Sequence, residues 1–403
     1  MDKKVGLVLE GGGAKGSYHL GVYKALHEMG YQFSGIAGTS IGALNGAIIA
    51  QGDWEKAYSI WDNISNEKIY GIDESTLKNI MKGNISLDNV SYVTNLLREF
   101  IKKKGIDTAN MKSLFFSILN EDKLQNSKVD LGIVTVKVEG FKTVEIFKEN
   151  IEPGQMQAYL MASANFPLFQ REETKDGQFI DGGIKNNLPL NMLPQKGINE
   201  LIAIRTFGVG VTKSYSNSDV HVTYIEPSKN LGGTLDFNNK TAKENLLLGY
   251  FDAYRTIQGY VGREFCIKPL MDDFLYINQM FENSDERILK AAKVMGYNNV
   301  DSRRFMFERL LPQIAEYLNL GLETSYETLL LLFFEEIAMI LPMDKTVIYD
   351  ADEFISEVKR KFVLKNLSLD KYLELPKIVK SSQFLTSFVK NDFFQFIMDI
   401  FFK

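Results

Sequence analysis

One serine of this chain stands in the pentapeptide GTSIG, a pattern that is typical of a catalytic nucleophile. Gly-x-Ser-x-Gly forms a nucleophile elbow, a sharp turn between a strand and a helix that lifts the serine oxygen above a sheet. The apolar run FSGIA precedes Ser40, and the small residues GALNGAIIA follow it. The alternative is that Ser40 is only a turn or helix-capping residue. We favour a nucleophile at Ser40 within an elbow formed by Gly38, Thr39, Ile41 and Gly42.

A glycine-rich loop, GGGAKG, follows the short apolar run Val5–Glu10. Its spacing also occurs in dinucleotide-binding proteins, but those place an acidic residue about 20 positions further on, where this chain has Thr39 and Ser40. A Walker A loop needs Gly-Lys followed by Ser or Thr, and this chain has Lys-Gly-Ser instead. We favour an oxyanion loop, whose backbone N–H groups stabilise a negative oxygen during acyl transfer. Its expected members are Gly11, Gly12, Gly13, Ala14, Lys15 and Gly16.

A serine hydroxyl needs a base to act as a nucleophile. No histidine of the chain stands in a motif that predicts this role, and for the first of them we expect a packing role; they are His19, His27 and His221. Asp181 is an alternative, because it ends the strand candidate QFID and precedes Gly182 and Gly183. Its carboxylate could therefore reach the sheet edge beside Ser40. An ordinary Asp-Gly turn is the other interpretation.

The elements that must position these residues alternate between strands and helices. The N-terminal run, the glycine loop, a helical pattern and a second apolar run predict an α/β fold with a mainly parallel sheet. Further strand candidates cover 129–138, 143–148, 178–181, 201–207 and 221–227. A helical insertion is expected at about 54–128, and a long helix at 238–262.

The pattern changes after the last strand candidate, where helical periodicity continues to the end of the chain. We therefore expect a catalytic domain at 1–270 and an all-helical domain at 271–403. The final segment, 381–403, is rich in phenylalanine. We favour core packing for it over a surface-binding amphipathic helix, because such helices carry more basic residues.

Composition limits the function classes. The chain has 403 residues, 45% of them hydrophobic, and a net charge of -5, which does not favour a nucleic-acid partner. A single cysteine, Cys266, and three histidines make a metal site or a disulfide framework an unfavoured interpretation. We expect no metal and no cofactor, a cytoplasmic location, no signal peptide and no membrane-spanning run.

The motifs GGGAKG, GTSIG and DGG, with MASANFPLF before the aspartate and NNLPL after it, occur in an order that resembles the patatin-like phospholipases. The resemblance covers roughly residues 3–265 and implies a three-layer α/β/α core. It also implies a Ser-Asp dyad, with Ser40 as nucleophile and Asp181 as base, beneath the glycine loop. Lys15 stands where many members have arginine, and DGG where many have DGA. We regard both departures as tolerated.

The resemblance implies a phospholipase A or lysophospholipase that cleaves carboxylic esters of lipids through an acyl-enzyme. Its expected partners are a lipid or phospholipid substrate and a peripheral membrane contact. An acyltransferase with the same dyad is the first alternative, although the related malonyl-type enzymes use a histidine base. A non-catalytic nucleotide-binding protein is the second. The sequence predicts neither the head-group preference nor the oligomeric state.

Overall fold

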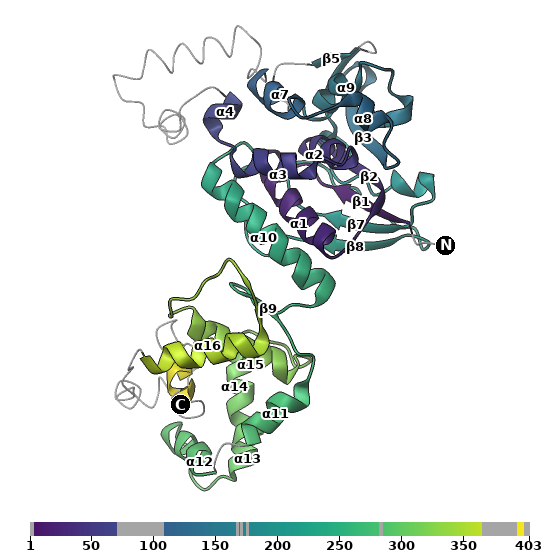
Figure 1. The fold of residues 1–403 in the computed structure, drawn as a ribbon. Coiled ribbons are helices and arrows are strands. Elements are labelled where there is room, and N and C mark those ends of the chain that lie inside the picture. The colour runs from purple at the N-terminus through teal and green to yellow at the C-terminus, as the bar shows by residue number, and fades with distance from the viewer. Residues whose placement is uncertain are drawn as a thin grey trace. The chain divides into compact units, whose positions relative to one another are not determined.

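A computed structural model describes residues 4–70, 109–166, 169, 172–174, 177–281, 285–364 and 393–398 (Figure 1). The chain divides into two compact units, Met1–Thr256 and Ile257–Lys403. The functional domains expected from the sequence, 1–270 and 271–403, stay a prediction.

The first unit is built on an eight-stranded sheet with the order β5-β6-β3-β2-β1-β7-β8, in which β4 also pairs with β3. The pairs β3–β2, β2–β1, β1–β7 and β7–β8 are parallel, and β4, β5 and β6 are antiparallel to their partners. The expected mainly parallel α/β fold is therefore confirmed. The strands are β1 Val5–Leu9, β2 Phe33–Thr39, β3 Asp130–Lys137, β4 Lys142–Phe147, β5 Glu172–Thr174, β6 Gly177–Asp181, β7 Glu200–Ile204 and β8 His221–Ile225.

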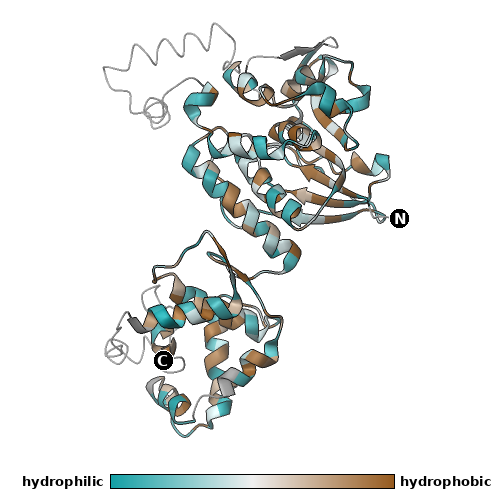
Figure 2. Cartoon of the chain, in the orientation of Figure 1, coloured by the Kyte–Doolittle hydropathy of each residue, from teal (hydrophilic) through white to brown (hydrophobic). Residues whose placement is uncertain are grey.

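Both faces of the central strands are covered, which explains why these strands are apolar throughout rather than alternating. Helix α2 lies against one face, where Gly46 lets it approach Leu9 and Ile36 closely. The other face packs Val8 and Ala37 against a cluster that includes residues of the segment 188–198. Figure 2 shows the central strands and α2 largely in the colour of apolar residues.

The helices of the first unit surround this sheet (Figure 1). Their bounds are α1 Ser17–Glu28, α2 Ile41–Ala50, α3 Trp54–Asp62, α4 Asn66–Tyr70, α7 Ala109–Phe116, α8 Glu121–Gln125, α9 Met156–Ser163 and α10 Asn239–Gln258, with short helical turns at Gly13–Gly16, Glu139–Phe141, Lys148–Asn150, Gly182–Ile184 and Leu193–Lys196. Within the expected insertion the described residues form α3, α4, α7 and α8, and residues 71–108 lie outside the described part.

Helix α10 packs closely on α1. A Cβ at Gly21 would lie 1.9 Å from the carbonyl oxygen of Leu246, and one at Gly249 would lie 2.4 Å from that of Tyr18, so the two backbones touch. The Tyr18 hydroxyl also donates a hydrogen bond to Asp252 at 3.0 Å. This contact holds α1, and with it the glycine loop that precedes α1, against the rest of the unit.

The second unit is mainly helical. It contains α11 Asp273–Phe281, α12 Asp285–Val294, α13 Ser302–Phe305, a π-helical turn at Met306–Leu310, α14 Leu311–Tyr317, α15 Tyr326–Ala338 and α16 Ala351–Leu364. The expectation of an all-helical unit needs one correction, because β9 Cys266–Lys268 and β10 Ile348–Asp350 form a two-stranded parallel sheet. Three residues per strand were too short to predict beside the longer helical patterns.

Core packing is confirmed for the described part of the C-terminal segment. Phe393, Phe394, Phe396, Ile397 and Met398 are buried in the core of the second unit, next to Tyr317 and Phe333. The remaining residues of 381–403 lie outside the described part. Among the described residues, no helix is long and apolar enough to cross a membrane.

Candidate active site

Ser40 stands at a sharp turn between β2 and α2. Its φ of 56° is in the left-handed region, which is strained for a residue with a side chain. The turn fits only small neighbours: a Cβ at Gly38 would lie 2.4 Å from the backbone of Gly42, and one at Gly42 would lie 2.4 Å from the Leu9 carbonyl oxygen. The local geometry is therefore that of a nucleophile elbow.

The Ser40 hydroxyl donates a hydrogen bond of 2.6 Å to Oδ2 of Asp181. The other carboxylate oxygen, Oδ1, accepts a hydrogen bond of 2.7 Å from the Gly183 amide, which fixes the orientation of the carboxylate. Both side chains are buried, with Ser40 8% and Asp181 5% exposed. The structure thus brings together the two residues on which the sequence-based hypothesis depends.

The register of three strands explains why these residues meet. On β3, Val134 is paired with Thr39 at the end of β2, and the next residue, Thr135, is paired with Asp181 at the end of β6. Strand β4 is paired with β3 over the same positions, so it occupies the other edge of β3. Strands β2 and β6 therefore run toward each other along one edge of β3 and meet end to end.

Burial changes the acidity of the dyad carboxylate. Desolvation raises the pKa of Asp181 to about 6, and the hydrogen bonds from Ser40 and Gly183 oppose that rise. A carboxylate with a raised pKa is a stronger base than an exposed aspartate. The environment of Asp181 thus suits proton abstraction near neutral pH.

A second serine, Ser163, binds the backbone of the elbow. The Ser40 amide donates to Oγ of Ser163 at 2.8 Å, and Ser163 in turn donates to the Val134 carbonyl at 2.6 Å. Ser163 is fully buried at the end of α9 Met156–Ser163. It therefore links Ser40 to β3, the strand with which Asp181 of β6 is paired.

The glycine loop lies beside the dyad, and its amides have different partners. Gly11 donates to the Asn187 carbonyl at 3.0 Å, Ala14 to the Thr234 carbonyl at 2.8 Å and Lys15 to the Gly12 carbonyl at 3.2 Å. Within the described part of the chain, the amides of Gly12 and Gly13 have no such partner. These two glycines also line the pocket that contains Ser40, so they are the best placed donors of the six expected loop residues.

Gly16, the last expected loop residue, has a packing role in the structure. It is buried, and a Cβ there would lie 2.6 Å from Ile41 and 2.9 Å from Trp61. Its carbonyl accepts a hydrogen bond of 2.9 Å from Asn45 on α2. Gly16 therefore joins the glycine loop to α2, the helix that follows Ser40.

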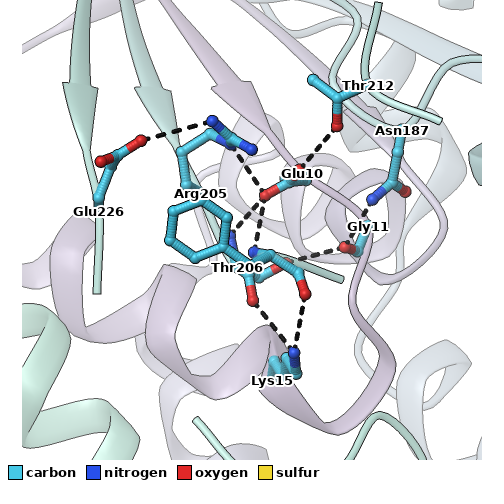
Figure 3. Close-up of polar contacts among 9 residues, drawn as sticks. Glu10, Gly11, Lys15, Asn187, Arg205, Thr206, Thr212 and Glu226 are labelled. Carbon is cyan, nitrogen blue, oxygen red and sulfur yellow. Dashed lines mark hydrogen bonds and ion pairs between the residues drawn. The ribbon is translucent and has the colours of Figure 1, made fainter. Parts of the chain in front are cut away.

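A buried carboxylate, Glu10, holds the glycine loop to the segment after β7 (Figure 3). Its Oε2 accepts hydrogen bonds from the amides of Thr206 (2.7 Å) and Phe207 (2.9 Å) and from Arg205 Nε (3.1 Å). Its Oε1 accepts one from the Thr212 hydroxyl at 3.1 Å. Glu10 is 1% exposed, and these four donors satisfy a charge that would otherwise be costly to bury.

The Lys15 side chain binds the same segment rather than the pocket. Its Nζ donates to the carbonyls of Thr206 (3.3 Å) and Phe207 (2.9 Å), as Figure 3 shows. Partial burial lowers the pKa of Lys15, and the charge of Glu10 opposes that shift. Lys15 therefore acts on the loop through the backbone at residues 206 and 207.

The histidines lie away from the dyad, as expected. His19 is fully buried on α1, and its Nδ1 is 3.3 Å from Nδ2 of Asn45. Burial lowers the pKa of His19 to about 3, so its ring is neutral at physiological pH. His27 is exposed beside Trp54, and His221 begins the strand β8. The expected packing role of His19 is confirmed.

A pocket opens at the dyad. Its polar lining comes from Ser40, Asp181, the glycine loop, Asn187 and Thr234. Its remaining lining is apolar, with Ile41, Met111, Ala164, Phe166, Phe169, Val209, Leu235 and Phe237. Among the residues that the structure describes, no group of three or more acidic, histidine or cysteine side chains could hold a metal ion. The arrangement suits an apolar chain whose reactive carbon lies beside Ser40.

The family model for patatin-like phospholipases matches residues 7–194. Over these residues the chain is similar to the patatin-like phospholipases. All three motifs of the site, together with the strand register that unites them, fall inside the matched range.

Several curated relatives are similar to this chain over about half of its length. Lysophospholipase NTE1 of Candida albicans is 26% identical over 210 residues, which are 50% of this chain and 13% of that protein. An uncharacterized NTE family protein of Mycobacterium tuberculosis is 27% identical over 202 residues, 50% of this chain and 48% of that protein. Patatin-like phospholipase domain-containing protein 7 of Mus musculus is 27% identical over 203 residues, which are 50% of this chain and 13% of that protein. The match therefore spans less than half the length of each of these relatives.

Among solved structures, VipD of Legionella pneumophila is similar with a TM-score of 0.40 and 14% identity, over 100% of this chain and 92% of that one.

Several residues of the site had no role in the sequence-based hypothesis. Glu10, Ser163 and Asn187 stand inside or beside quoted motifs, but only the fold shows what their side chains contact. The segment FGVGV at 207–211 does carry a detectable signal, because glycines that alternate with apolar residues indicate a close approach of two backbones.

Proposed function

We propose that this chain is a serine lipid acyl hydrolase of the phospholipase A or lysophospholipase type, which cleaves carboxylic esters through a Ser40–Asp181 dyad and an acyl-enzyme. The observation that carries the proposal is the 2.6 Å hydrogen bond from Ser40 Oγ to Asp181 Oδ2, in a pocket whose lining is mainly apolar. The names of the relatives, two of which contain the word lysophospholipase or phospholipase, support the substrate class.

The first half of the reaction forms the acyl-enzyme. Asp181 Oδ2 takes the hydroxyl proton of Ser40 while Oγ forms a bond to the ester carbonyl carbon. The carbonyl oxygen becomes negative, and the bond to the leaving alcohol breaks as that alcohol takes the proton from Asp181. The Gly183 amide keeps the carboxylate facing Ser40 throughout, because it holds the oxygen that does not carry the proton.

The negative oxygen needs donors that are already in place. We assign this role to the amides of Gly12 and Gly13, which line the pocket beside Ser40. Helix α2 begins directly after Ser40, and the positive end of its dipole adds a favourable field at the same point. Loss of one oxyanion donor typically lowers kcat by about 10²–10³.

The second half of the reaction releases the acid. A water molecule at the position of the departed alcohol gives a proton to Asp181 and attacks the acyl carbon. The bond to Ser40 Oγ then breaks, and Oγ recovers the proton from Asp181. The raised pKa of Asp181 serves both halves, because the same carboxyl must accept and return a proton near neutral pH.

Two variants test the dyad on a soluble chromogenic short-chain ester. Ser40→Ala removes the nucleophile and Asp181→Asn removes the base, so each should lower turnover by at least about 10³-fold while the circular dichroism spectrum stays that of the parent. His19→Gln is a matched control that alters a buried polar residue outside the dyad. Robust turnover by Ser40→Ala or Asp181→Asn would refute the assignment.

A lipid panel assayed by mass spectrometry, with Ser40→Ala as the blank, identifies the ester that is cleaved. Added alcohols in the same assay distinguish a hydrolase from an acyltransferase, because an acyltransferase would pass the acyl group to the alcohol. A fluorescent phosphonate that labels the parent but not Ser40→Ala would argue against a nucleotide-binding protein without catalysis.

A further inference from the structure

The segment 207–211, with the sequence FGVGV, carries a row of exposed apolar side chains. Phe207 is 52%, Val209 71% and Val211 52% exposed. Apolar residues scattered singly on a surface are ordinary, but a contiguous group of them marks a binding surface. We call these three side chains the apolar ridge.

The two glycines between the ridge residues lie against the candidate catalytic loops. A Cβ at Gly208 would lie 2.0 Å from the Gly11 carbonyl oxygen, and one at Gly210 would lie 2.6 Å from the Gly183 carbonyl oxygen. Neither position has room for a side chain. The alternation of glycine with apolar residues thus has a physical reason, since one side of the segment touches the loops and the other side carries the ridge.

Hydrogen bonds hold the ridge in place at both ends. The Val211 amide donates to the Gly183 carbonyl, and its carbonyl accepts from the Asn187 amide, both at 2.8 Å. Glu10 binds the Phe207 amide at one end of the segment and the Thr212 hydroxyl at the other. These hydrogen bonds hold the backbone of the ridge against the glycine loop and the segment after Asp181.

One ridge residue is also part of the pocket. Val209 lines the pocket that contains Ser40 and Asp181, so the ridge and the pocket share a wall. We propose that the apolar ridge docks on the surface of a lipid aggregate and brings the pocket mouth to it. This inference rests on the proposed function, because it names where the substrate of that site comes from.

The surroundings of the ridge favour a phospholipid surface as the occupant. A lipid ester must pass from its aggregate into the pocket, and a pocket edge that enters the aggregate shortens the path through water. The exposed Lys213 lies two positions after the segment, and the Arg205 guanidinium, which also pairs with Glu10 and Glu226, lies 4.6 Å from the centre of the Phe207 ring. Cations beside apolar side chains suit the phosphate layer above the acyl chains.

The test separates docking from catalysis. Phe207→Ser with Val211→Ser removes two ridge side chains that do not line the pocket. In a Ser40→Ala background, which prevents hydrolysis, co-sedimentation with phosphatidylcholine vesicles should weaken by about tenfold or more. With Ser40 intact, turnover of a soluble short-chain ester should stay within about twofold of the parent, whereas turnover of the vesicle lipid should fall about tenfold.

The chain offers a closely matched control in Phe141. This residue is 48% exposed with a φ of 49°, against 52% and 46° for Phe207, and a cation, that of Lys185, lies over its ring at 4.1 Å. Phe141→Ser should leave vesicle binding unchanged. If the double variant does not fold, Val211→Ser alone provides the same comparison.

The outcomes are distinct. Weaker vesicle binding by the ridge variant but not by Phe141→Ser supports the proposal. Equal binding by parent and ridge variant, equal losses in both variants, or no binding by the parent overturns it. A parent dimer that the ridge variant converts to a monomer in light scattering would also overturn it, in favour of a second copy as the occupant. Absence of ester turnover by the parent refutes the proposed function without affecting vesicle binding.

Discussion

The Ser40 hydroxyl and the Asp181 carboxylate lie 2.6 Å apart although 141 positions separate them in the chain. They meet because β2 and β6 approach each other along one edge of β3, where Thr39 and Asp181 are paired with the adjacent residues Val134 and Thr135. The candidate active site is therefore a consequence of strand register.

The acidity of Asp181 predicts a dependence of activity on pH. Only the ionised carboxylate can take the Ser40 proton, and burial raises its pKa to about 6. We expect kcat/KM on a soluble ester to rise about tenfold per pH unit below 6 and to level off above it. An aspartate with an ordinary pKa near 3.9 would leave the rate flat down to about pH 5, and that result would contradict the assignment of Asp181 as a desolvated base.

The same shift predicts that Asp181→Asn stabilises the protein at neutral pH. A folded-state pKa above the unfolded value means that the proton on Asp181 favours the folded state. This contribution is fully present below about pH 3.8 and is lost as the pH rises through 6. An amide needs no proton, and it can still accept from the Gly183 amide and donate to Ser40 Oγ.

We therefore expect Asp181→Asn to raise the free energy of unfolding by about 1–3 kcal/mol at pH 8, as measured by urea denaturation. The gain should shrink on acidification and vanish near pH 4. A variant that is less stable than the parent at pH 8 would show that the carboxylate does not carry a desolvation cost.

Glu10 is expected to position the glycine loop. Glu10→Ala leaves the donors of Arg205, Thr206, Phe207 and Thr212 without their acceptor. We expect a loss of about 2–4 kcal/mol in the free energy of unfolding and a fall of about 10–100-fold in kcat, with a smaller change in KM. Kinetics on a soluble ester and urea denaturation measure the two effects.

Two variants control for this prediction. Glu10→Gln keeps an acceptor oxygen and should recover most of the stability and the rate. Glu226 pairs with the same Arg205 guanidinium at 3.4 Å but is half exposed, so Glu226→Gln should change stability by less than about 0.5 kcal/mol. A loss in Glu226→Gln equal to that in Glu10→Ala would point to the arginine rather than to the loop.

Ser163 is expected to support the elbow. Ser163→Ala leaves the buried Ser40 amide without its acceptor, which should cost about 1–3 kcal/mol of folding stability. We also expect kcat to fall about tenfold, because the strained turn at Ser40 loses one of its restraints. Ser117→Ala is the control, since the Ser117 hydroxyl donates to the nearby Leu114 carbonyl in an exposed position. An unchanged kcat in Ser163→Ala would limit this serine to a structural role.

The sequence alone determined the local features of this protein. Short, continuously apolar runs predict strands β1, β2 and β3, and the glycines of GTSIG predict the elbow. These signals depend only on neighbouring residues in the sequence. The motif order was enough to predict the family and to name Ser40 and Asp181. The helical pattern likewise predicted the second unit, apart from the short pair β9–β10.

Only the tertiary structure decided how distant segments contact one another. No local pattern shows that β6 pairs with the part of the β3 edge that β2 leaves unpaired. Nor does a local pattern show that Glu10 and Lys15 bind the segment at 205–212, or that Gly208 and Gly210 lie on the candidate catalytic loops. These contacts join residues that are far apart in the sequence. They depend on which buried polar groups need a hydrogen-bond partner and on where two backbones touch in the folded chain. The glycine loop thus had six candidate donors in the sequence. In the fold, other segments bind the amides of Gly11 and Ala14, the Gly12 carbonyl binds that of Lys15, and Gly12 and Gly13 line the pocket.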